Sequence, residues 1–145
     1  MSQRKFTWVL AVFLISVCAA ALDQSSTPVV KHVPIKSTSP VSGHEMYTTY
    51  CAACHGTDGK GGGPAASALK VPPPNLTVLS KNNGGKFPSD KVSAVLSGTA
   101  GLPAHGSKEM PVWGHLFWSV SHGSSGEVQL RMRNLTKYIE SLQEK

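Results

Sequence analysis

The sequence is poor in cysteine, in acidic residues and in long apolar runs. Three cysteines in 145 residues exclude a disulfide-dense scaffold, and a single long apolar run excludes a multi-pass membrane protein. The chain shows no internal repeat, and no segment alternates between apolar and polar residues as a strand would. Glycine and proline are plentiful, with 14 and 10 residues, which predicts short elements joined by long loops. A loop-rich chain with so little apolar material needs something besides side chains to fill its core.

The N-terminus has the organisation of a secretory signal peptide. Arg4 and Lys5 precede an uncharged apolar run over residues 6–17, and small residues follow up to Ala21. We expect cleavage after Ala21, which would remove Cys18 and lower the formal net charge from +6 to +4. An uncleaved anchor helix is the alternative, because the apolar run is near the lower length limit for crossing a bilayer. A lipoprotein modified at Cys18 is disfavoured by the large residue before it.

The sequence divides into three predicted segments. Residues 1–21 are predicted to be the signal peptide, residues 22–40 a flexible linker rich in Ser, Thr and Pro, and residues 41–145 one compact domain. The protein is therefore expected in the periplasm or otherwise exported. A membrane-anchored protein is the alternative if the signal stays uncleaved.

Capping and periodicity predict an all-α domain with three main helices. The first and last, over residues 42–54 and 124–142, each begin with a Ser-x-x-Glu capping box. The second, over residues 88–98, has apolar residues at helical spacing and ends at a glycine. Turn-forming sequence lies between them, including residues 98–114, which we expect to be loop.

The first helix ends in Cys51-Ala52-Ala53-Cys54-His55, the Cys-x-x-Cys-His pattern of covalent c-type haem attachment. Cysteines three residues apart lie on one side of a helical turn, so each can form a thioether with one vinyl group, and His55 then points its imidazole at the iron. A zinc site would need more than two thiols, a thioredoxin-like redox pair would need a βαβ pattern, and a disulfide between Cys51 and Cys54 is the third alternative. The motif predicts one haem c, attached through both cysteines and ligated by His55.

Met110 is the candidate for the second axial ligand of the haem iron. It precedes Pro111 in a loop rich in Gly and Pro, well after the haem-binding helix, so it can fold over the opposite face. His105 is the rival ligand. Met46 and Met132 lie on predicted helices and are expected to serve in packing.

Over roughly Val41–Lys145 the chain resembles a class I monohaem c-type cytochrome, and the predicted compact domain is then a cytochrome c domain. The resemblance implies the small cytochrome c fold, in which three main helices, short helices and long loops wrap around one covalently bound haem. In that family a glycine and an aromatic residue on the first helix cross a Leu-x-x-Tyr site on the last helix. Here Gly43 and Tyr47 would meet Leu135 and Tyr138.

Two further family motifs have counterparts in this chain. Pro74-Asn75-Leu76 matches the Pro-x-Leu that follows the haem motif, and the resemblance implies that the Pro74 carbonyl accepts a hydrogen bond from Nδ1 of His55. Met110-Pro111-Val112-Trp113-Gly114 matches the methionine loop. Loops 59–63 and 82–86 depart from the spacing of mitochondrial-type cytochromes, so the resemblance does not imply the same redox partners.

The residue types in the loop-rich half of the chain predict the surroundings of the haem. The apolar residues expected around it are Leu69, Val71, Leu76, Leu79, Val95, Leu102, Val112, Trp113 and Phe117. Lysines in the loop-rich half would form a basic rim that steers an acidic redox partner, or else a scattered solvated surface: Lys60, Lys70, Lys81, Lys86, Lys91 and Lys108.

The haem motif and the two candidate axial ligands predict an electron-transfer protein and not an enzyme. With His55 and Met110 both bound, the iron has no open position for a substrate. We expect a carrier of single electrons in a respiratory chain, between a dehydrogenase or quinol-oxidising complex and a terminal oxidase or other acceptor. The alternatives are a haem subunit of a larger oxidoreductase complex and a ligand-binding haem protein with a labile Met110. Nucleic-acid binding has no support, because the sequence has no basic stripe or stacking platform.

Overall fold

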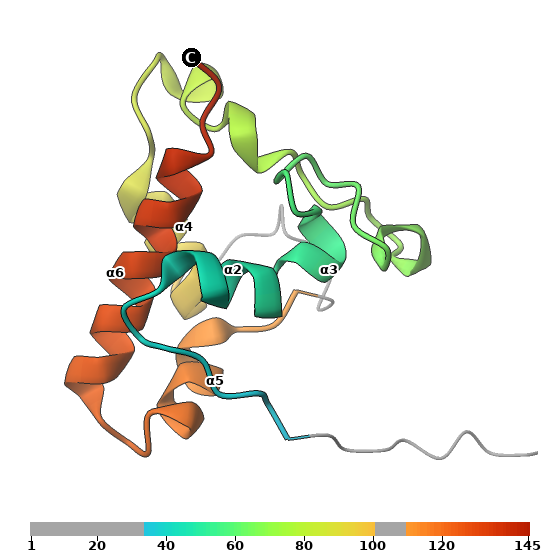
Figure 1. Cartoon of the computed structure of the whole chain (residues 1–145). Helices are drawn as coiled ribbons and strands as arrows, with labels where there is room; N and C mark the ends of the chain where they lie inside the picture. Colours follow the sequence, from blue (N-terminus) through green and yellow to red (C-terminus); the bar gives the residue numbers. More distant parts are fainter. Residues whose placement is uncertain (1–33, 101–109) are drawn as a thin grey trace, which may run out of the picture. The chain divides into compact units, whose positions relative to one another are not determined.

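The computed structural model describes residues 34–100 and 110–145. These residues form α-helices and short 3-10 turns joined by loops, and none of them forms a strand (Figure 1). The elements are α2 (Gly43–Tyr50), α3 (Ala52–His55), η1 (Ala66–Ala68), η2 (Leu76–Val78), η3 (Lys81–Asn83), α4 (Ser89–Ser97), α5 (Trp113–Val120) and α6 (Ser125–Ser141). The predicted all-α fold is confirmed.

Some predicted features lie outside the described residues. They are the signal peptide, most of the linker, Leu102, His105 and Lys108. Within the described ranges, no helix combines the length and the apolar character needed to span a membrane.

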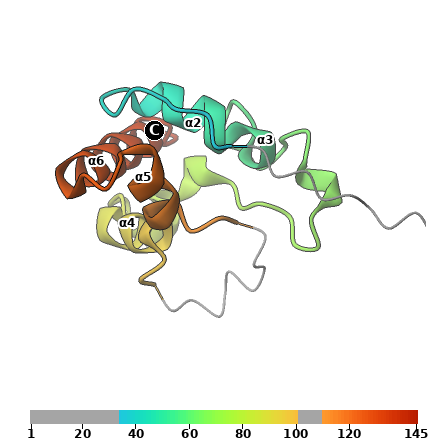
Figure 2. The same cartoon turned by 90° about the horizontal axis from the view of Figure 1, so that it is seen from below.

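Helix α6 is the element against which the other long helices pack. It contacts α2, α4 and α5 (Figure 2). It begins where the capping box predicts, because the Ser124 side chain accepts a hydrogen bond from the Glu127 N–H at 3.4 Å. Leu135 and Ile139 are buried on its inner face, so the apolar side of this helix faces the core.

Helices α2 and α6 cross at Gly43. A Cβ atom on this residue would overlap the main-chain oxygen of Asn134 and would lie 2.7 Å from Cβ of Tyr138. Only a glycine allows two backbones to approach so closely. Beside this point the Tyr47 and Tyr138 rings pack with their centroids 5.2 Å apart, and Leu135 is fully buried. The structure therefore contains the helix crossing that the resemblance implies.

The predicted first helix is divided at Cys51, whose φ of −111° departs from helical geometry. Helix α2 ends at Tyr50, and α3 is a single turn that ends at His55. The hydrogen bonding continues across the division, because the Cys51 N–H donates to Tyr47 O at 2.8 Å and the His55 N–H donates to Cys51 O at 2.9 Å. The turn that carries the Cys-x-x-Cys-His motif is therefore fixed directly to α2.

The described residues also include α5, a helix that the sequence analysis does not predict. It starts at Trp113, inside the segment expected to be loop, and its N-cap Val112 makes no side-chain hydrogen bond. The start therefore lacks the Ser-x-x-Glu signal that marks the first and last helices. Trp113 and Phe117 are buried, and their rings pack on Tyr50 with centroids 5.1 Å and 5.8 Å away. Tertiary packing stabilises this short helix.

The last part of the predicted linker contacts the helices. Thr38 is 6% exposed, and its hydroxyl lies 3.0 Å from Oη of Tyr50. The Asn134 side chain donates a hydrogen bond to the Pro40 carbonyl at 2.9 Å. Residues 38–40 therefore differ from a flexible tether, because their polar groups find partners on α2 and α6 that composition does not reveal.

Candidate functional site

A cavity of about 290 Å³ lies among α3, α4, α6 and the loop that precedes α4. Its lining residues are Cys51, His55, Pro74, Leu76, Leu79, Asn82, Asn83, Pro88, Lys91, Val92, Val95, Leu96, Met110 and Ile139. Most of these side chains are apolar, with a few polar groups among them. This is the character of a site for a small molecule or a cofactor.

The two cysteines of the motif lie at the junction of α2 and α3. Cys51 is 6% exposed and lines the cavity, whereas Cys54 is half-buried and is not among the lining residues. No disulfide joins them. Burial raises the pKa of the Cys51 thiol to about 12, and the neighbouring Cys54 adds to this effect. Before any attachment, Cys51 is therefore a protonated thiol at neutral pH.

His55 is buried and lines the same cavity. Its Nδ1 lies 3.3 Å from the carbonyl oxygen of Pro74. A carbonyl can only accept a hydrogen bond, so Nδ1 carries the proton and Nε2 is the ring nitrogen that can bind a metal. The structure thus brings together the His55 and Pro74 pair that the resemblance implies.

Met110 lines the cavity together with His55, although the two residues are far apart in the chain. Its side chain is half-buried. Met46 is fully buried in the core, and Met132 lines a separate groove between α4 and α6. Of the methionines in the described ranges, Met110 is the one that meets the cavity. His105, the rival ligand, lies outside those ranges.

The apolar residues expected around the haem divide into two groups. Leu76, Leu79 and Val95 line the cavity. Five others are not among its lining residues: Leu69, Val71, Val112, Trp113 and Phe117. Trp113 lies instead in the core, with its ring packed against Tyr50.

Three apolar lining residues were not predicted to surround the haem: Val92, Leu96 and Ile139. A signal for the first two was present, because they belong to the apolar stripe of α4 that also carries Val95. A helix that covers a cavity presents its apolar face to it. Ile139 had no such signal, since the stripe of α6 serves both the core and the cavity.

A model of the family described as Cytochrome c matches residues 41–143. The chain belongs to the cytochrome c family. No curated protein and no solved structure gives a match.

Cytochromes c carry a covalently attached haem c, and the residues of this chain fit that cofactor. The Cys51 thiol lines the cavity with Cys54 one helical turn further on, and the His55 imidazole, with Nδ1 next to the Pro74 carbonyl, lines it too. The remaining wall is largely apolar, as a porphyrin face requires. The haem therefore accounts for the lean apolar content of this cytochrome c, because it occupies a centre that side chains do not fill.

Tyr47 holds the loop that follows the haem motif. Its hydroxyl donates a hydrogen bond to the Gly56 carbonyl at 2.7 Å, in the buried interior. Burial raises the pKa of Tyr47 to about 12. The phenol of this cytochrome therefore stays protonated and keeps donating at neutral pH.

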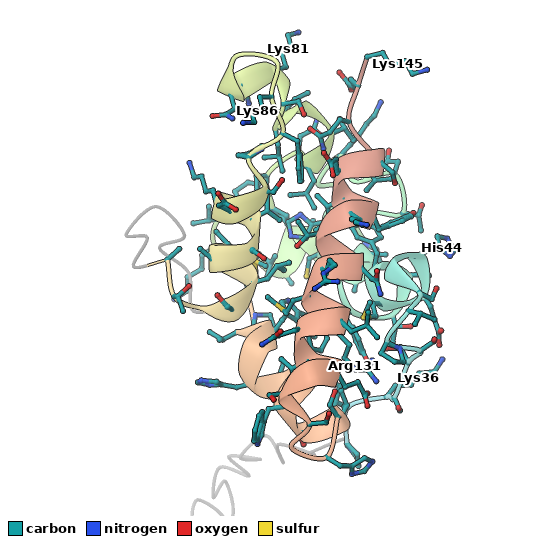
Figure 3. The ribbon with its side chains drawn as sticks, turned by 90° about the vertical axis from the view of Figure 1, so that its left-hand side faces the viewer. Lys36, His44, Lys81, Lys86, Arg131 and Lys145 are labelled. Atoms are coloured by element: carbon teal, nitrogen blue, oxygen red, sulfur yellow. The ribbon has the colours of Figure 1, made fainter. Side chains whose placement is uncertain are left out.

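The lysines of the predicted basic rim that lie in the described ranges are exposed: Lys60, Lys70, Lys81, Lys86 and Lys91. Lys81 and Lys86 lie near the C-terminal end of α6 (Figure 3), and Lys91 lines the cavity itself. Positive charge is thus present next to the haem site of this cytochrome.

Proposed function

We propose that this cytochrome carries single electrons between redox proteins of a respiratory chain, with His55 and Met110 as the two axial ligands. When bound, the haem supplies an iron ion that changes between the ferrous and ferric states. His55 holds one axial position through Nε2. Met110 offers its thioether sulfur to the other, which favours ferrous iron and raises the reduction potential.

The observation that carries this proposal is the shared cavity of His55 and Met110. Two side chains that fill both axial positions leave no site for a substrate. The apolar residues of α4 and α6 limit the access of water, which further favours the less charged ferrous state. An electron carrier needs these properties, whereas an enzyme needs an open coordination position.

The surroundings of the cavity also suit a protein partner. Lys91 lines the cavity, and Lys81 directly precedes Asn82 and Asn83, which also line it. Lys86 lies near Lys81, at the C-terminal end of α6. A basic rim accelerates encounter with an acidic redox protein through long-range attraction, an effect that salt weakens. We therefore place the electron-transfer contact on the face that carries these lysines.

Replacing Met110 by alanine tests the axial assignment. The purified holoprotein should lose the long-wavelength absorption band of ferric iron bound to a thioether. Its reduction potential should fall, because the ligand that favours ferrous iron is gone. Absorption spectroscopy and a spectroelectrochemical titration measure the two effects.

Met132→Ala is the matched control, since Met132 lines the separate groove between α4 and α6. This variant should keep both the band and the potential. An unchanged ferric spectrum in Met110→Ala would contradict the assignment, and His105→Ala would then test the rival ligand.

A parent protein that binds cyanide or imidazole rapidly in the ferric state would favour the ligand-binding alternative.

We also propose that the protein is exported and that residues 1–21 are removed in the process. The basic residues, the apolar run and the small residues that end at Ala21 support this. The mass of the protein purified from the exported fraction should equal that of a chain beginning at Leu22 plus one haem. A mass that includes residues 1–21 would instead indicate an uncleaved anchor.

A further inference from the structure

Gly61 contacts both partners of the hydrogen bond between His55 and Pro74. Its N–H donates to the main-chain oxygen of His55 at 2.8 Å. On its other side, its Cα faces the backbone of Pro73 and Pro74. One residue therefore links the main chain of the axial histidine to the segment that supplies the acceptor carbonyl.

The packing at Gly61 leaves no room for a side chain. A Cβ atom would overlap the carbonyl oxygen of Pro73 and would lie 3.6 Å from the carbonyl carbon of Pro74. These are backbone atoms of a proline-rich segment, so they cannot move aside as a flexible side chain would. Gly61 also has φ of 90°, a conformation that favours glycine.

We infer that Gly61 is a positioning residue for the axial histidine: it seats the Pro73–Pro74 segment so that the Pro74 carbonyl meets Nδ1 of His55. This inference rests on the proposed function, in which His55 ligates the iron. The hydrogen bond makes the imidazole a stronger electron donor, which stabilises ferric iron. By seating the acceptor, Gly61 lowers the reduction potential relative to a chain in which this bond is broken.

Gly61→Ala tests the inference in the haem-loaded protein. The added methyl group should displace the Pro74 carbonyl, so that the Nδ1 proton of His55 exchanges with solvent on the order of tenfold faster. The reduction potential should shift to more positive values, because the imidazole becomes a weaker donor. NMR of the ferrous protein measures the exchange, and spectroelectrochemistry measures the potential.

Two neighbouring glycines provide matched controls. A Cβ on Gly62 meets nothing within 4 Å, so Gly62→Ala should leave both quantities at the parent values. Gly59 has φ of 77°, but the nearest atoms to its Cβ belong to the flexible side chains of Leu142 and Thr77, at 3.2 Å and 3.4 Å. Gly59→Ala therefore adds similar backbone strain without a clash against the Pro73–Pro74 backbone. Parent-like exchange and potential in Gly61→Ala would overturn the inference, as would equal shifts in Gly59→Ala.

A second measurement on the unmodified protein covers the case in which Gly61→Ala does not fold. The Gly61 N–H and the Nδ1 proton of His55 should become exposed in one shared local opening, and therefore show the same protection from exchange. A Gly61 N–H that exchanges much faster than the His55 proton would overturn the inference. This result does not depend on Met110, so it separates a failed role of Gly61 from a failed axial assignment.

Discussion

Gly43→Ala should lower the free energy of unfolding by about 3 kcal/mol, at the upper end of what overpacking costs. The new methyl group would overlap the main-chain oxygen of Asn134 and would crowd Cβ of Tyr138 at 2.7 Å. Asn134 lies in the middle of α6, where its carbonyl takes part in the helix. The clash is relieved only if α2 moves away from α6, which breaks the packing of Tyr47 against Tyr138. Denaturant unfolding of the holoprotein, followed by far-ultraviolet circular dichroism, measures the loss.

Gly126→Ala makes the same change in a helix where space is open. Gly126 lies in the first turn of α6, and a Cβ there meets nothing within 4 Å. We expect this variant to be as stable as the parent or about 0.5 kcal/mol more stable, because alanine favours the helix. Equal stabilities for the two variants would show that α2 and α6 do not meet closely at Gly43.

Arg131→Met should lower the free energy of unfolding by about 3 kcal/mol. Arg131 is 2% exposed although it is charged, and Figure 3 shows it near the N-terminal end of α6. Its guanidinium donates to Thr38 at 3.0 Å, to Ser121 at 3.0 Å and to Glu127 at 2.8 Å. These bonds join the segment before α2, the end of α5 and the first turns of α6. Methionine keeps the apolar stem and removes every donor, so denaturant unfolding reports the loss of the bonds themselves.

Arg133→Met is the control on the same helix, because Arg133 is exposed. We expect its stability within about 0.5 kcal/mol of the parent, as for most surface changes. If Arg131→Met were no less stable than Arg133→Met, the buried hydrogen bonds would contribute nothing to the fold.

Acid should reduce the difference between Arg131→Met and the parent. Hydrogen bonding from Arg131 holds the pKa of Glu127 below its usual value in the folded protein. The stability linked to Glu127 is therefore present above its unfolded pKa of about 4.3 and is lost as the pH falls through its lower folded pKa. Unfolding measured at neutral pH and at several acidic values should show the two proteins converging. A constant difference would mean that Glu127 does not depend on Arg131.

Features formed by neighbouring residues were predictable from the sequence. The Cys51–His55 motif forms one helical turn, and its chemistry depends on spacing along that turn alone. The start of α6 was also predictable, because Ser124 and Glu127 make their contact within the same turn. By contrast, α5 begins at Trp113, and its N-cap residue Val112 makes no side-chain hydrogen bond. Trp113 and Phe117 pack on Tyr50, a residue of another helix, so no pattern within the segment predicted α5.

By itself, the sequence determined the helical class and the haem motif, and its resemblance to the family implied which residues meet where α2 and α6 cross. Tertiary structure alone decided which distant side chains share the cavity. Met110 lines it, whereas Trp113 packs against Tyr50 in the core. It also buried Arg131 and packed the backbone of Pro73 against Gly61. The physical reason is the separation along the chain over which each interaction acts. Helical periodicity and covalent spacing act over one or two turns, whereas burial and close packing depend on segments that only folding brings together.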